Sequence, residues 1–102
     1  MKELFWTRHS IFKMREHVLS KSRVLRTIHS PSRVEKGIAE GTVAIMRKEK
    51  AIKKEYEVWV MVTDSGSTRR IISAWRYPGV TRPGDPLPQS ILAEIENALL
   101  EA

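Results

Sequence analysis

Imidazoles, cations, hydroxyls and carboxylates supply the chemistry available to this sequence, and His9, Lys13 and Arg76 stand out among them. The sequence contains no cysteine, which excludes disulfides, thiolate zinc sites and cysteine nucleophiles. Cleavage of RNA by attack of its own 2′-hydroxyl needs only this set of groups. It requires a base for the 2′ proton, an acid for the 5′ oxygen and cations beside the phosphorane. We therefore expect metal-independent cleavage of RNA as the chemistry to test first.

Each of these residues also has a purely structural explanation. His9 could be a buried histidine bonded to backbone, Lys13 a solvated helix residue, and Arg76 the ion-pair partner of Glu55 across a hairpin. His9 and His17 have no Asp or Glu spaced to complete a metal site with them. The sequence also has no Gly-rich phosphate loop and no nucleophile elbow. We expect neither a metal nor a cofactor.

The charge of the sequence is unevenly distributed. It has 18 Lys and Arg against 12 Asp and Glu, a net charge of +6. Residues 85–102 hold four acidic residues and no Lys or Arg, so residues 1–84 carry 18 basic and 8 acidic groups, or +10. Such a cationic body favours a polyanionic partner, because phosphate neutralisation supplies most non-specific nucleic-acid affinity. The same charge could instead serve solubility alone.

Length and composition indicate a single globular domain. At 102 residues the chain can bury one core, and 41% hydrophobic with 29% charged residues argues against disorder. No apolar run is long enough to span a bilayer, and charged residues near the N-terminus interrupt the apolar run of a signal peptide. We expect a soluble cytoplasmic protein, which the lack of cysteine also fits.

Residues 56–77 form the centre of the predicted fold. Two runs of β-branched and aromatic residues flank a turn at Ser65 and Gly66, which predicts a β-hairpin. With these two residues as the loop, Val62 pairs with Arg69. One face, expected to be core, then carries Tyr56, Val58, Val60 and Val62 beside Arg69, Ile71, Ser73 and Trp75.

The opposite face of this hairpin mixes aromatic, acidic and cationic side chains. We expect function there, because a solvated sheet face rarely has such a composition. Trp59 and Trp75 fit a core better than they fit platforms for stacking bases. The mixed face consists of Glu55, Glu57, Trp59, Met61 and Thr63 beside Arg70, Ile72, Ala74 and Arg76.

Helices are predicted before this hairpin and strands around it. Helical periodicity predicts one helix over residues 8–19 and a second, capped by Ser20 or Ser22, that ends at Pro31. Alternation then predicts an edge strand over 33–39 and a strand over 42–48. Residues 47–54 form a basic hairpin tip, which could be a solvated turn or a phosphate-binding element, with its lysines at Lys48, Lys50, Lys53 and Lys54.

The C-terminal region has a different composition. Residues 77–88 hold four prolines and two glycines, so they should cross the domain without regular structure. A helix then begins near Gln89, with acidic residues opposite its apolar stripe. We expect this helix to pack on the mixed face of the sheet, with another subunit as the alternative. The stripe consists of Ile91, Leu92, Ile95, Ala98 and Leu99.

The N-terminal half resembles the pattern of a known family. It contains His9-Ser-Ile-Phe-Lys13-Met14-Arg-Glu-His17-Val-Leu19-Ser20, followed by Val24, Ile28 and Pro31. This is similar to His-Ala-x-x-Arg-Met-x-x-Arg-Gly-Ile-Ser-x-x-x-Val-x-x-x-Ile-x-x-Pro, the pattern of an uncharacterised domain family related to the RelE/BrnT-type toxins. The resemblance covers residues 6–77, including helices before strands and the Gly turn before the last strand.

The resemblance implies two helices packed on a small twisted antiparallel sheet. It also implies endoribonuclease cleavage of messenger RNA, held in check by an antitoxin. His9 falls on the family histidine, Lys13 on a family arginine and Met14 on the core methionine. The chain departs from the pattern elsewhere, since Ser10 replaces Ala, Lys13 Arg, His17 a second Arg and Val18 Gly.

These observations combine into one prediction. The fold is α+β, with two N-terminal helices on a three- or four-stranded antiparallel sheet and a C-terminal amphipathic helix. Residues 1–84 form a RelE/BrnT-like domain, on which the acidic helix of residues 85–102 packs. The protein is a metal-independent endoribonuclease, or else a non-catalytic RNA-binding or protein-interaction module, and exists as a monomer or homodimer. RNA and a small acidic antitoxin are its expected partners, with no membrane.

Specific residues carry the functional part of this prediction. His9 is assigned as acid or base, and Lys13 and Arg76 as the cations that stabilise the phosphate. The acidic C-terminal helix could cover this site or provide a second surface. The residues expected to bind RNA through their charge are Lys48, Lys50, Lys53, Lys54 and Arg70.

Overall fold

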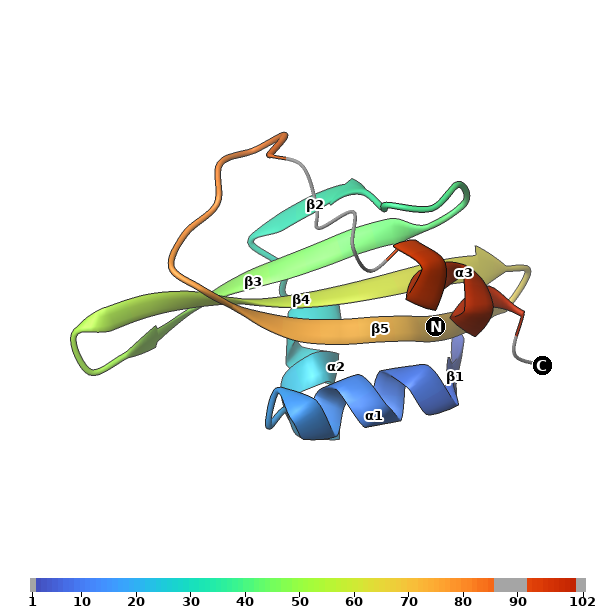
Figure 1. The fold of residues 1–102 in the computed structure, drawn as a ribbon, viewed down its shortest axis with the longest axis horizontal. Coiled ribbons are helices and arrows are strands. Elements are labelled where there is room, and N and C mark those ends of the chain that lie inside the picture. Colours follow the sequence, from blue (N-terminus) through green and yellow to red (C-terminus); the bar gives the residue numbers. More distant parts are fainter. Residues whose placement is uncertain (1, 86–91, 101–102) are drawn as a thin grey trace.

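The computed structural model describes residues 2–85 and 92–100, which form a five-stranded sheet and three helices (Figure 1). Helices α1 and α2 lie on one face of the sheet, here called the first face, and α3 lies on the other, the second face. In chain order the elements are β1 (Glu3–Trp6), α1 (Arg8–Glu16), α2 (Lys21–His29), β2 (Arg33–Lys36), β3 (Val43–Ala51), β4 (Lys54–Ser65), β5 (Thr68–Pro78) and α3 (Leu92–Leu99).

The sheet is mixed, with the strand order β1-β5-β4-β3-β2. Strands β2 to β5 are antiparallel, but β1 runs parallel to β5, with Phe5 opposite Arg70. The antiparallel sheet of three or four strands expected from the sequence is therefore wrong, although the α+β class is right. The error comes from β1, because a strand as short as Glu3–Trp6 shows little alternation and its partner lies at the far end of the sequence.

Helix α1 is fixed at both ends by local hydrogen bonds. The hydroxyl of Thr7 accepts from the backbone N–H of Ser10 at 3.1 Å and donates to the carbonyl of Ile71 on β5 at 2.8 Å. At the other end the N–H of Leu19 donates to the carbonyl of Met14 at 2.8 Å. This bond closes a Schellman motif, so the helix ends before residue 19.

Helix α2 begins at Ser20, whose hydroxyl accepts from the N–H of Arg23 at 3.1 Å. Ser20 rather than Ser22 is therefore the cap. The helix buries Val24 and Thr27 against the sheet and stops before Pro31, as the sequence predicted. In the described part of the chain, none of the helices has both the length and the apolar character needed to cross a bilayer.

The hairpin of β4 and β5 has a different register from the expected one. Its loop is Gly66 and Ser67, so Val62 pairs with Ile71 instead of Arg69. A β-bulge follows, since Met61 pairs with Ser73 and leaves Ile72 as an extra residue on β5. Beyond the bulge, the side chains of β5 point to the opposite face of the sheet from the one expected from the sequence.

The reversal corrects the predicted composition of both faces. Ala74 and Arg76, expected on the second face, lie on the first, opposite Val60 and Val58. Trp75, expected on the first face, lies on the second, where it pairs with Trp59 and stacks on it, with 5.8 Å between ring centroids.

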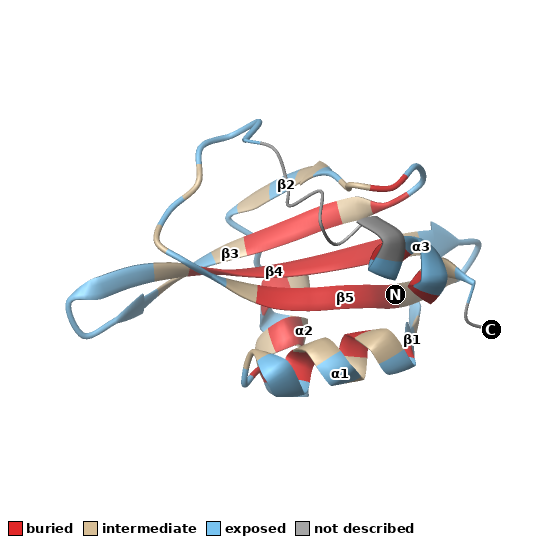
Figure 2. Ribbon diagram, viewed as in Figure 1, coloured by how far each residue is buried: buried red, intermediate tan, exposed pale blue. Residues whose placement is uncertain are grey.

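Both faces of the sheet are buried (Figure 2). The expectation that the second face is a functional surface is wrong, because its side chains form a second hydrophobic core. The prediction of Trp59 and Trp75 as core residues is confirmed, since they are 2% and 7% exposed. The second core consists of Ala39, Ala44, Met46, Trp59, Met61, Ile72, Trp75, Ile95 and Ala98.

Two C-terminal segments cover this second core. Ile95 and Ala98 of α3 pack on it, while Gln89 and Ile91, predicted near the helix start, lie outside the described residues. The segment after β5 is held by Glu57, whose fully buried carboxylate accepts from the N–H and hydroxyl of Thr81 at 2.9 and 2.8 Å. Arg33 and Glu35 of β2 also bond Thr81 and Gly84. Residues 79–85 therefore act as a strap from the end of β5 to β2, and Figure 1 shows this segment arching from β5 toward β2.

Candidate nucleic-acid interface

A groove rich in arginine lies where the end of α1, the start of α2 and the end of β5 meet. It has a volume of about 630 Å³ and opens widely to solvent. A hollow of this size can accept part of a nucleotide. This arginine groove is lined by Met14, Arg15, Val18, Leu19, Ser20, Arg23 and Arg76.

The β-bulge and the end of α1 position Arg76 in this groove. The bulge turns Arg76 toward the first face, where its guanidinium donates to the carbonyls of His17 and Val18 at 3.3 and 3.2 Å. The same guanidinium lies over the ring of Tyr56, 4.7 Å from its centroid. The predicted alternative, an ion pair with Glu55, does not form, because the true register places Arg76 opposite Val58.

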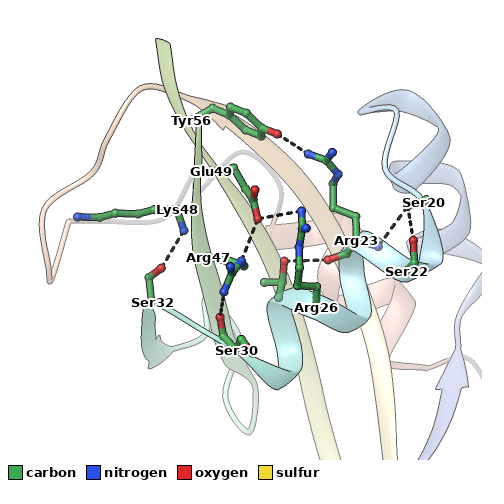
Figure 3. Close-up of polar contacts among 11 residues, drawn as sticks. Ser20, Ser22, Arg23, Arg26, Ser30, Ser32, Arg47, Lys48, Glu49 and Tyr56 are labelled. Atoms are coloured by element: carbon green, nitrogen blue, oxygen red, sulfur yellow. Dashed lines mark hydrogen bonds and ion pairs between the residues drawn. The ribbon is translucent and has the colours of Figure 1, made fainter. Parts of the chain in front are cut away.

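Tyr56 joins a second arginine to the groove. The Tyr56 hydroxyl accepts a hydrogen bond from Arg23 of α2 (Figure 3). Tyr56 therefore contacts Arg76 through its ring and Arg23 through its oxygen. Because the hydroxyl acts as an acceptor toward Arg23, its own proton remains available to donate.

Among the described residues, no carboxylate forms an ion pair with the arginines of the groove. The bonds of Arg23 and Arg76 go to hydroxyl and carbonyl oxygens, which are neutral. Among residues 2–85 and 92–100, the ion pairs join neither these two nor Arg15 to a carboxylate. By contrast, Glu49 pairs with two other arginines nearby, Arg26 and Arg47, at 3.2 and 2.9 Å (Figure 3). The groove is thus suited to an anion.

The lysines of the predicted hairpin tip lie beside this groove on a projecting ribbon. Strands β3 and β4 extend beyond the last pair with β2, Arg33 with Met46, and the last pair with β5, Tyr56 with Pro78. Residues 48–55, here called the lysine arm, form this extension (Figure 1). Its four predicted binding residues are all exposed: Lys48, Lys50, Lys53 and Lys54.

His9 and Lys13 lie in a separate pocket between α1 and α3, of about 350 Å³. His9 Nε2 is 3.9 Å from the Glu94 carboxylate, and Lys13 pairs with Glu16 at 2.6 Å. The hydrogen bond and charge of Lys13 lower the pKa of Glu16 below its usual value. His17 lies eight positions after His9 along the chain, a rise of about 12 Å, so the pocket of His9 and Lys13 is distinct from the groove at Arg76.

His17 connects the two sites. Burial lowers the pKa of its imidazole, and the cations of Lys13 and Arg76 lower it further, while Glu16 raises it. The ring is therefore neutral at pH 7, and its Nδ1 accepts from the backbone N–H of Arg76 at 3.2 Å. With Nδ1 engaged in this way, His17 holds the end of α1 against β5.

Arg70, the remaining predicted binding residue, lies at the other end of β5. Its guanidinium donates to the carbonyls of Leu99 and Ala98 at 3.0 and 3.4 Å, so it caps the C-terminus of α3. Six strand residues separate it from Arg76, a distance of about 20 Å. The structure thus brings Arg76 and the arm lysines to one side of the molecule and places Arg70 elsewhere.

Sequence patterns offered no reason to choose Arg23, and they assigned Tyr56 to the core. Both are functional candidates only because α2 packs beside the end of β4. A signal for Tyr56 did exist, since it comes first in a row with Val58, Val60 and Val62 and is the only hydroxylated member of that row. Arg23 carries no such signal, because basic residues are common on the exposed side of a helix.

The groove has no ligand set for a metal. Within the described residues, no three His, Cys, Asp or Glu side chains come together as metal ligands. The chain matches no protein-family model, no curated protein and no solved structure. Its function must therefore be inferred from the charges and geometry of the groove, the arm and their surroundings.

Proposed function

We propose that this protein binds RNA along the arginine groove and the lysine arm and cleaves the bound strand without a metal ion. One observation carries the proposal: Arg23 and Arg76 hold a tyrosine between them and direct unneutralised charge into an open groove. Arginines in this arrangement can contact the oxygens of a phosphate and stabilise negative charge that builds on it. The resemblance of residues 6–77 to the RelE/BrnT-type toxins supports the same activity.

The proposed reaction uses the RNA as its own nucleophile. The 2′-oxygen attacks phosphorus, its proton passes to water, and the bond from phosphorus to the 5′-oxygen breaks. Tyr56 donates its hydroxyl proton to that oxygen, while Arg23 and Arg76 stabilise the phosphorane. The products are a 2′,3′-cyclic phosphate and a 5′-hydroxyl. In this scheme His9 and Lys13 lie outside the reacting centre, in the pocket beneath α3.

Three variants separate binding from cleavage on a single-stranded RNA. Changing Arg23 and Arg76 together to Gln should weaken binding and lower the salt dependence of log affinity, by roughly 0.7 for each phosphate that is no longer neutralised. Tyr56→Phe should retain binding and lose cleavage, on the order of a hundredfold for a general acid. The control is Lys36→Gln, an exposed residue of the edge strand β2, which should change neither property.

The chemistry is tested with the same substrate. Cleavage should persist in a chelator and should stop when the RNA carries 2′-deoxyribose at the cleaved position. Binding that depends on both arginines, without cleavage by the wild-type protein, would assign the alternative function, a non-catalytic RNA-binding module. Affinity that is unaffected by the arginine variants would refute the groove as the site.

We also propose a cellular context: a cytoplasmic protein, monomeric or homodimeric, which by the resemblance is inhibited by a small acidic antitoxin. A second groove offers a surface for such a partner, because Lys2, His29 and Arg69 rim its apolar floor, with Arg69 paired to Asp64 at 2.7 Å. Expression of the wild-type chain in a bacterial host should arrest growth and degrade transcripts. Arrest should be relieved by Tyr56→Phe, and normal growth with intact transcripts at high expression would argue against a toxin. The apolar floor of the second groove consists of Leu4, Leu25 and Ile28.

A further inference from the structure

The apex of the lysine arm carries an aliphatic side chain in full contact with solvent. Ile52 is 91% exposed, and its neighbours Ala51 and Lys53 are exposed as well. A single exposed isoleucine is ordinary on a protein surface. This one lies at the end of a projecting two-stranded ribbon, with lysines on each side of it in sequence, and that position requires an explanation.

The lysines of the arm lie on both faces of the ribbon. Lys48 pairs with Glu57 and Lys50 with Glu55, which places these lysines on the second face of the ribbon. Lys54 pairs with Ala51 and so lies on the first face, two residues before Tyr56 and the arginine groove. The arm is therefore a ribbon with lysines on both faces, with Glu55 opposite Lys50 on the second face, and with an apolar tip.

The base of the arm is held firmly by α2. Glu49 accepts from Arg47 of the same strand and pairs with Arg26 of α2, while Tyr56 directly across from Glu49 bonds to Arg23 (Figure 3). A ribbon that is oriented before binding loses less conformational entropy when it docks. The tip can thus be presented to a ligand in one orientation.

We propose that the lysine arm enters the minor groove of a base-paired RNA stem and inserts Ile52 at a base step, with its lysines on the phosphates of both strands. The inference rests on the proposed RNA binding and names the form of RNA that is recognised. An A-form minor groove is wide and shallow, so a ribbon tip reaches the base edges. Aliphatic wedges at base steps are a recurring device of proteins that enter the minor groove of DNA, and the wider A-form groove gives the same kind of tip access to a base step.

The shape and chemistry of the arm favour a stem over the other anionic ligands. A single strand is held by aromatic platforms on which bases stack, and Ile52 has no such surface. An anionic membrane would also attract lysines, but one isoleucine buries too little apolar area to anchor the protein there. Because the first face of the arm continues into the arginine groove, a stem with a single-stranded extension would occupy both.

The test uses an RNA hairpin with 2-aminopurine in its stem and a single-stranded tail, beside a single-stranded RNA of equal length. Binding of wild-type protein should raise the 2-aminopurine fluorescence, because a wedged base step unstacks. Ile52→Asn should abolish that rise and weaken stem affinity about tenfold, with unchanged affinity for the single strand. Ile52→Leu should keep both properties, and Val34→Asn, at a 56% exposed position on β2, is the matched control.

The lysines add an independent measurement. Lys50→Gln and Lys54→Gln, from opposite faces of the arm, should each lower the salt dependence of stem affinity, by roughly 0.8 for each phosphate that the lysine neutralises. An effect of only one of them would overturn the placement of the arm between two strands. Wild-type affinity and fluorescence in Ile52→Asn would overturn the wedge.

Two further outcomes are distinguishable. Vesicles of phosphatidylserine that bind the wild-type protein but not Ile52→Asn, with stem affinity intact, would assign the tip to membranes and refute the proposal. Unchanged affinity of the arginine variants for single-stranded RNA would refute the groove as the RNA site. Unchanged stem affinity and fluorescence in Ile52→Asn would refute only the wedge. Each proposal therefore has its own readout.

Discussion

The two faces of the sheet are both buried, but different parts of the chain cover them. The first face is covered by α1 and α2, and its fully buried core is aliphatic apart from Met14, with Trp6 and Tyr56 partly buried against it. The second face is covered by α3 and by the strap of residues 79–85. It contains the stacked pair of Trp59 and Trp75 and the buried carboxylate of Glu57.

This difference separates the anchoring contacts from the candidate binding site. The aromatic and charged residues of the second face hold the C-terminal segments, since Glu57 bonds Thr81 and Arg70 caps α3. On the first face the charged residues lie at the rim, where Arg23 and Arg76 face an open groove. The mixed side-chain composition of the second face therefore indicated tertiary contacts. The candidate site lies at the edge of the first face, whose side chains are more uniformly apolar.

The largest expected effect lies on the second face. Glu57→Ala removes the acceptor of the Trp59 Nε1–H, at 2.9 Å, and of both donors of Thr81. Leaving the buried Trp59 donor and the part-buried Thr81 donors unsatisfied should cost about 3 kcal/mol of unfolding free energy, measured by urea denaturation. Glu55→Ala, an exposed change on the same strand, is the control and should cost under ~0.5 kcal/mol. Equal losses of unfolding free energy in Glu57→Ala and Glu55→Ala would contradict the anchoring role of the second face.

The docking of α3 is tested by its buried anchor. Ile95 is 0% exposed, so Ile95→Ala should cost about 3 kcal/mol, or the docking free energy of the helix if that is smaller. Amide exchange in α3 should accelerate, while RNA affinity of the arginine groove stays unchanged. Leu100→Ala, at an 84% exposed position beside the helix, should have no effect. A drop in groove affinity in Ile95→Ala would show that the two faces are coupled.

At the rim of the first face, one substitution should stabilise the protein. Val18 follows α1 with φ of 55°, a left-handed conformation that is unfavourable for a β-branched residue and preferred by glycine at this position. Because Val18 is 80% exposed, Val18→Gly loses little packing. It should increase the unfolding free energy by about 1 kcal/mol, measured as a higher melting temperature. Val34→Gly, in strand β2, should have the opposite sign. Two losses of equal size would contradict the strain at Val18.

The smallest effect is a dependence on pH. The pKa of His17 is lowered in the folded protein, mainly by burial, so the unfolded chain takes up a proton first as the pH falls. Stability should therefore decline as the pH drops through the ordinary histidine range, about 6.5, and be fully present above it. His17→Asn can replace the acceptor for the Arg76 N–H and cannot titrate, so its stability should change less between pH 7.5 and pH 5.5. Identical pH profiles for the two proteins would exclude this contribution of His17.

Local patterns were enough to predict most of the elements. Helical periodicity, a serine cap and Pro31 predicted α1 and α2, and alternation around turns predicted β2, β3 and both hairpins. The resemblance to the toxin pattern placed Gly at position 18, where the structure has a left-handed valine. Caps, turns and helix ends depend on residues that are close in sequence, so a single sequence is enough to predict them.

The candidate site was predicted only in part, because its geometry depends on distant contacts. Arg76 and the arm lysines lie together, but Arg70 caps α3 and His9 lies in a pocket beneath that helix. The position of Arg76 follows from the bulge at Ile72, which leaves no mark in the alternation of the strand. A register change of one residue reverses the faces of everything that follows.

The sequence by itself determined the order of helices and strands, the uneven charge and the exposed basic ribbon, since these depend on neighbouring residues and on composition. Tertiary structure decided the pairing of β1 with β5, the burial of the second face and the meeting of Arg23, Tyr56 and Arg76. Each of these needs segments that are distant in the sequence to pack together. The free energy that selects such contacts comes from burial and hydrogen bonds formed only in the folded state.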